Sequence, residues 1–102
     1  MKTIRMVEES GVFAEDKDVA AVLRTKVIGP SLSRNHKVAI DFDEVTLTTQ
    51  SFVHALISKP VRDLGERSLD LLLFKNCSAL VQGLIETVVQ YSLEAVELAE
   101  EP

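Results

Sequence analysis

The sequence predicts an α/β fold, in which one open sheet carries helices. Short runs of β-forming residues alternate with segments whose apolar residues recur at helical spacing, in the order strand, helix, strand, helix, strand, helix. The 102 residues suffice for one hydrophobic core, and 46% hydrophobic against 26% charged residues favours a folded chain. We therefore expect a single domain over residues 1–102, with 95–102 as a frayed acidic tail.

Two strands and one helix are predicted in the first half. Residues 3–7 alternate weakly between apolar and polar side chains, which is typical of a short strand. Over 16–28 the apolar residues follow helical spacing, and Gly29 and Pro30 are expected to stop this helix. Residues 37–42 are β-formers between turn-like segments, which predicts a buried strand.

Helices dominate the predicted second half. A helix is expected to begin near Ser51, because a hydroxyl there can accept a hydrogen bond from a first-turn amide, and Pro60 is expected to kink or restart it. Residues 71–74 form the most apolar short run, which predicts a central strand buried on both faces. Apolar residues every three or four positions over 80–98 predict a long amphipathic last helix.

The composition of the chain excludes several classes of function. A net charge of −5 without a basic block argues against nucleic acid. Cys77 is the only cysteine, so neither an internal disulfide nor a multi-cysteine metal site is expected, although the start of a helix beside it can lower a thiol pKa. The chain lacks the apolar run of a secretory signal or membrane span. We expect a cytoplasmic protein that binds a protein partner and no membrane.

Residues 41–56 hold an unusual concentration of polar side chains between two apolar segments. The three carboxylates, Asp41, Asp43 and Glu44, are of the type that binds hard cations. However, alternate strand residues share a face only while the strand stays extended, so a solvated strand end is favoured over a metal site. No metal ligand is therefore assigned.

Catalysis is not favoured at the same junction. His54 follows Ser51 by three residues, so the two are neighbours on a helix, but nothing orients them towards a substrate. The sequence contains no serine-hydrolase elbow, phosphate-binding glycine loop or redox cysteine pair. A helix-surface or partly buried histidine is the preferred interpretation, and no catalytic residue is assigned.

A phosphorylation switch is the third interpretation. The free amides and dipole of a helix start stabilise a phosphate, which makes Ser51 a suitable acceptor. The same phosphate would repel Asp41, Asp43 and Glu44. Phosphorylation would then change the charge of a docking surface without disturbing the fold.

The sequence "KVAIDFDEVTLTTQSFVHAL", followed by "GERSLDLLLFKN" and a terminal helix, resembles the STAS-like domain family of unknown function. This family is a relative of the STAS domain of bacterial anti-sigma-factor antagonists, and the resemblance runs from about Gly11 to about Val89. It implies an open mixed sheet of about four strands with helices packed on it, regulatory protein contacts, no catalysis and no cofactor. It also places Ser51 at or beside a residue phosphorylated by a histidine-kinase-like ATPase, and Asp41 at the strand aspartate.

The chain departs from the antagonists at one position of this motif. Where they have an aspartate, two hydroxyl residues and a glycine, it has Thr49, Gln50, Ser51 and Phe52. The bulky Phe52 is expected to hold a kinase away from the backbone, which leaves helix capping as the alternative role of Ser51.

The sequence thus leaves three functions open. The preferred one is a regulatory module that docks on a partner protein through a loop and a helix start. The residues assigned to that docking surface are Asp43, Thr49, Gln50, Ser51 and His54. The alternatives are a small hydrolase or metal-dependent enzyme at the junction from Asp41 to His54, and a homodimer assembled through the last helix.

Overall fold

The computed structural model describes the backbone of residues 1–100 and the side chains of residues 1–96. It contains five strands in two parallel sheets, so the α/β class is confirmed, while the strands divide between two sheets and every pair is parallel. The larger sheet has the order β1-β3-β5 and the smaller pairs β2 with β4. Their bounds are β1 (Lys2–Arg5), β2 (Phe13–Ala14), β3 (Val38–Asp41), β4 (Leu47–Thr48) and β5 (Leu72–Lys75).

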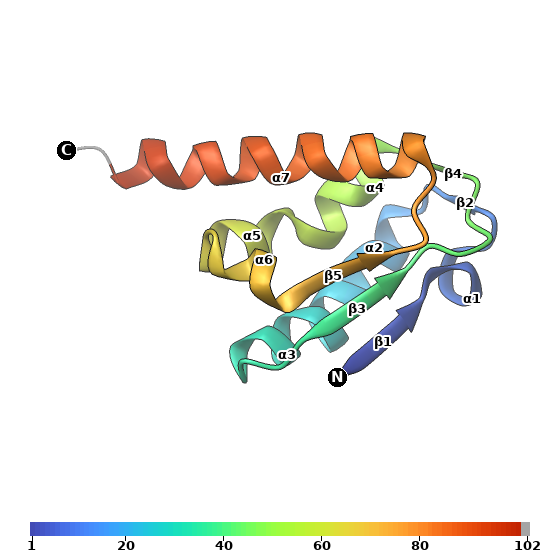
Figure 1. The fold of residues 1–102 in the computed structure, drawn as a ribbon, viewed down its shortest axis with the longest axis horizontal. Coiled ribbons are helices and arrows are strands. Elements are labelled where there is room, and N and C mark those ends of the chain that lie inside the picture. Colours follow the sequence, from blue (N-terminus) through green and yellow to red (C-terminus); the bar gives the residue numbers. More distant parts are fainter. Residues whose placement is uncertain (101–102) are drawn as a thin grey trace.

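Helical segments connect the strands and lie along one face of the larger sheet (Figure 1). The long C-terminal helix α7 runs beside the segments that link β3 to β5 and contacts α4, η2 and α5. Two segments, η1 and η2, are π-helical turns inside longer helices. The bounds are α1 (Met6–Ser10), α2 (Lys17–Leu23), η1 (Arg24–Ile28), α3 (Gly29–Ser33), α4 (Gln50–Val53), η2 (His54–Ser58), α5 (Lys59–Leu64), α6 (Arg67–Leu71) and α7 (Ala79–Glu100).

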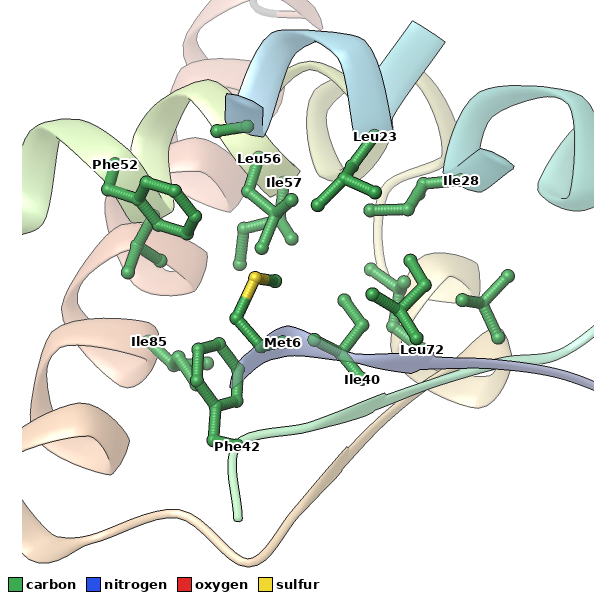
Figure 2. Close-up of a cluster of buried hydrophobic side chains, with 14 of the residues drawn as sticks. Met6, Leu23, Ile28, Ile40, Phe42, Phe52, Leu56, Ile57, Leu72 and Ile85 are labelled. Atoms are coloured by element: carbon green, nitrogen blue, oxygen red, sulfur yellow. The ribbon is translucent and has the colours of Figure 1, made fainter. Parts of the chain in front are cut away.

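The hydrophobic core lies between the sheet and these helices (Figure 2). Met6, the first residue of α1, points toward Leu56 and Ile57 of η2, and all three side chains are fully buried. Ile40 of the central strand and Phe52 of α4 are also fully buried. Each such side chain stabilises the fold by roughly 1.5–3 kcal/mol relative to its exposed state.

Two crossover helices, each made of three consecutive elements, continue through a proline. The first consists of α2, η1 and α3, and the second of α4, η2 and α5. A proline lacks an N–H and its ring clashes with the carbonyl four residues earlier. The helix widens instead: Gly29 donates its N–H to the carbonyl of Arg24, five residues back, and α3 continues to Ser33. The predicted stop at Gly29 and Pro30 is therefore wrong.

A similar π-helical turn, η2, precedes Pro60 in the second crossover helix. The carbonyl of Ala55 lies five residues before Pro60, which has no N–H to donate. Arg24 supplies the missing donor, because its Nη1 lies 2.9 Å from the Ala55 oxygen. The two crossover helices are thus joined where the second one is widened. Because η2 continues directly into α5, the predicted restart at Pro60 is wrong.

The predicted strand over residues 71–74 is displaced. Leu71 ends α6, because Leu72 donates its N–H to the carbonyl of Ser68 and closes the last helical turn. The strand that follows is an edge strand, so Leu73 and Phe74 are only half-buried, and burial on both faces is wrong. The central strand is β3, where Val38, Ala39 and Ile40 are fully buried, as predicted for residues 37–42.

The two ends of the chain differ from the prediction in smaller ways. The first strand ends at Arg5, and residues predicted as its continuation, from Met6 onward, begin α1. Helix α7 includes residues 95–100, which the sequence assigned to the acidic tail. The remainder of that predicted tail, residues 101–102, lies outside the described residues.

Candidate functional site

Asp41, at the carboxyl end of β3, fastens two loops of the structure. Its Oδ1 accepts a hydrogen bond from the N–H of Asp43 at 2.9 Å and another from Nδ2 of Asn76 at 3.0 Å. The Asn76 hydrogen bond is the main reason that the pKa of Asp41 is lowered, and the Asp43 hydrogen bond adds to it. Arg5 and Lys75, the register partners of Asp41 on the flanking strands, lower it further.

The neighbouring carboxylates point to separate places. Glu44 adopts a positive φ of 68° and its Oε2 lies 3.4 Å from Nη2 of Arg5. Asp43 is exposed to solvent. Within the described residues, no three His, Cys, Asp or Glu side chains form a group suited to a metal ion.

The threonines of the loop have internal partners. Thr46 and Thr48 donate their hydroxyls to the carbonyls of Val12 and Ala14, at 3.2 and 2.8 Å, and so hold β4 to β2. Thr49 accepts a hydrogen bond at 3.1 Å from the N–H of Phe52. Thr49 is therefore the N-cap of α4, and the alternative in which Ser51 caps this helix is wrong.

Gln50, Ser51 and His54 form the exposed face of this helix start. Together with Lys17, Ala55 and Tyr91 they line a shallow hollow of about 550 Å³. His54 is held within it by Tyr91, whose hydroxyl lies 2.7 Å from Nδ1. The Ser51 hydroxyl makes no hydrogen bond to any described residue, so it remains available to a partner.

Phe52 does not stand on this face. Its side chain is fully buried and points into the core beside Leu56 (Figure 2). The expectation that its bulk holds a kinase away from the backbone is therefore wrong. Helix geometry explains the error. Successive side chains point about 100° apart around the helix axis, so Ser51 faces solvent while Phe52 faces the core.

Sequence reasoning missed several residues at this surface. Lys17 and Tyr91 reach the hollow from α2 and α7, and their distance along the chain hides them from any local pattern. Phe13 and Leu47 are register partners in the smaller sheet and remain 42% and 46% exposed. Both precede a helix start in sequence, Phe13 before α2 and Leu47 before α4.

The Cys77 thiol is not activated, because its pKa is raised and not lowered. Burial raises its pKa, and the negative charge of Asp41 raises it further. The lowering of the pKa that a helix start can produce is therefore not found at Cys77, because these two effects dominate. The Cys77 Sγ lies 3.8 Å from the carbonyl oxygen of Lys75, next to Asn76, which donates a hydrogen bond to Asp41.

No helix among the described residues has the length and apolar character needed to cross a membrane.

Comparison with known proteins identifies the family. No curated protein and no solved structure shows significant similarity to the chain. The family model of the STAS-like domain of unknown function matches residues 19–82, which is more than half of the chain and lies within the predicted stretch from Gly11 to Val89. The chain therefore belongs to the STAS-like domain family of unknown function.

Proposed function

We propose that the protein is a non-enzymatic cytoplasmic regulatory module that docks on a partner protein. The partner is a histidine-kinase-like ATPase, and the docking surface is the loop and helix start around Ser51. This surface comprises Asp43, Thr49, Gln50, Ser51 and His54. Family membership supports the proposal, since the related anti-sigma-factor antagonists use the same helix start.

The free Ser51 hydroxyl is the observation that carries this proposal. Thr49 already caps α4, so Ser51 is not needed to satisfy the first-turn amides. Ser51 is exposed and shares its hollow with Lys17. A phosphate on Ser51 would be stabilised by the helix start and by this cation.

The rival enzyme would need Asp41 and His54 to work together. Asp41 is held by Asn76 before α7, whereas His54 is held by Tyr91 within α7. Tyr91 lies twelve positions after Ala79, where α7 begins, which corresponds to about 18 Å of helix at 1.5 Å per residue. The two side chains therefore serve different parts of the structure, which favours docking over joint catalysis.

Affinity purification from the native host tests the proposal. We expect the tagged protein to recover an ATPase. Ser51→Glu adds a negative charge to the docking surface and Asp43→Lys replaces a negative charge by a positive one, so each should reduce recovery of the ATPase about tenfold. Ser33→Glu is the matched control, because Ser33 is an exposed serine at the end of α3, away from this surface. Equal recovery by all variants, or no recovered partner, would contradict the proposal.

Phosphorylation is tested with the recovered ATPase and ATP. Mass spectrometry is expected to find one phosphate on the peptide containing Ser51, and none on that peptide from Ser51→Ala. An unmodified Ser51 in a stable complex would retain docking but refute the switch.

A further inference from the structure

We propose a second binding surface, at the free edge of β5, for an extended basic segment of another protein. The segment would add a fourth strand to the larger sheet and place apolar side chains in a groove between β5 and α7. This surface is separate from the one around Ser51, and the inference does not depend on the proposed function.

The edge of β5 offers unpaired main-chain groups. Within the described residues, β5 pairs with β3 alone. Phe42 donates its N–H to the carbonyl of Lys75 at 2.9 Å, so the main-chain groups of Lys75 face β3. Because these groups alternate in direction along a strand, the N–H and C=O of Phe74 face the free edge.

An apolar groove adjoins this edge. Phe74, Ile85 and Glu86 are shared by two neighbouring hollows of about 380 and 470 Å³. The first extends along α7 past Val89 and Leu93 to Leu69, which is 42% exposed. The inner face of the sheet is therefore open at β5.

The opposite edge of the sheet lacks such an opening. Ile4, Ile40 and Phe74 form one register row across the three strands. Ile4 on edge strand β1 is 4% exposed and Ile40 is fully buried, whereas Phe74 is only half-buried. In this row, only the side chain on β5 is left partly exposed. One more strand beside β5 would bury it.

The charges beside the groove select the occupant. From Asn76 to the end of the chain the sequence contains no Lys or Arg, and Glu86 lines both hollows. Lys75, the exposed cation next to Phe74 on β5, alternates to the opposite face of the strand from the groove. A second copy related by a two-fold axis would bring the acidic α7 against its own equivalent. A partner strand carrying Lys or Arg meets complementary charge instead.

The expected occupant follows from strand geometry. Side chains of an added strand alternate between faces, so every second residue would lie in the groove. Most of those residues would be apolar, to cover Phe74, Val89 and Leu93. One of the groove-facing residues would be a Lys or Arg that reaches Glu86 in the groove lining, and main-chain hydrogen bonds to Phe74 would fix the register.

A phage-displayed peptide library selected on the purified chain tests this inference. We expect enriched peptides to carry apolar residues at every second position, with a Lys or Arg at one position of that same set. Synthetic versions should bind Glu86→Lys about tenfold more weakly, because the groove charge is reversed. Glu8→Lys, which changes an exposed acid on α1, is the matched control and should leave the affinity unchanged.

The edge hydrogen bond is tested separately with Phe74→Ala and Phe74→Pro. Both remove the ring, and only proline removes the N–H, so the proline variant should bind more weakly than the alanine variant. Failure to enrich any peptide, or equal binding to wild type and Glu86→Lys, would overturn the inference. Concentration-dependent dimerisation in sedimentation experiments that Phe74→Ala abolishes would identify a second copy as the occupant and overturn the assignment to another protein.

Discussion

The segments Asp41–Thr49 and Gln50–His54 are adjacent in the chain and equally rich in polar groups, but they use them differently. In the first, the side chains of Asp41, Thr48 and Thr49 bind other parts of the chain. In the second, Gln50 and Ser51 face solvent and Phe52 and Val53 fill the core. Apart from Asp43, which is exposed, and His54, which contacts Tyr91, polar residues that close the fold and polar residues available to a partner thus meet at Thr49.

This difference shows how a polar cluster should be interpreted. A hydroxyl or carboxylate with an internal partner is constrained by the fold, and its replacement changes stability. One without an internal partner can change without cost to the fold, so its chemistry is free for binding. Substitutions on either side of the boundary should therefore separate stability from docking.

The largest effect is expected for Phe52→Ala, directly beside Ser51. Phe52 is fully buried, and truncation of such a ring costs about 3–5 kcal/mol of unfolding free energy. Urea denaturation followed by circular dichroism measures it. A loss below about 1 kcal/mol would place Phe52 on the surface and contradict the division at Thr49.

A smaller effect is expected for Thr49→Ala. Loss of the hydrogen bond to the Phe52 amide should lower the unfolding free energy by about 1 kcal/mol. Thr49→Ser keeps the capping oxygen and should remain close to wild type. If serine and alanine were equally destabilising, the threonine methyl group and not the cap would be responsible.

The contribution of Asp41 is expected to depend on pH. Its folded pKa is lowered below the ordinary value of 3.8, chiefly by Asn76, so ionised Asp41 stabilises the fold above that pH. This stabilisation disappears as pH falls through the folded pKa. The melting temperature of the wild type should exceed that of Asp41→Asn at pH 7, and the two melting temperatures should converge in acid. A difference that does not change with pH would contradict a stabilising role of the hydrogen bonds to ionised Asp41.

The smallest effect on stability is expected for Ser51→Ala. The hydroxyl has no partner among the described residues, so the unfolding free energy should change by less than about 0.5 kcal/mol. A loss as large as that of Thr49→Ala would mean that Ser51 supports the helix and is not reserved for a partner.

The sequence predicts those parts of the structure that depend on local pattern. The apolar run that became β3 is confirmed, and so is the start of the helix predicted from residue 16, where Asp16 accepts the N–H of Asp18 at 2.9 Å. Ser51 was identified because hydroxyls favour helix starts, although the structure assigns the cap to Thr49 two residues earlier.

Features that depend on distant partners were not predictable. Pro30 was expected to end a helix, but a widened turn accommodates it. The strand after Leu71 was expected at the centre of the sheet, because an apolar run does not distinguish a central strand from an edge strand beside an open groove. Tyr91 joins the candidate site only because α7 packs against α4 and η2.

Hydrogen exchange of the complex with the recovered ATPase tests the docking claim most directly. We expect slower exchange in the loop from Asp43 to Thr49 and in the first turn of α4, with little change at the β5 edge. Unchanged exchange at Gln50 and Ser51, with protection elsewhere on the chain, would contradict the assignment of this surface.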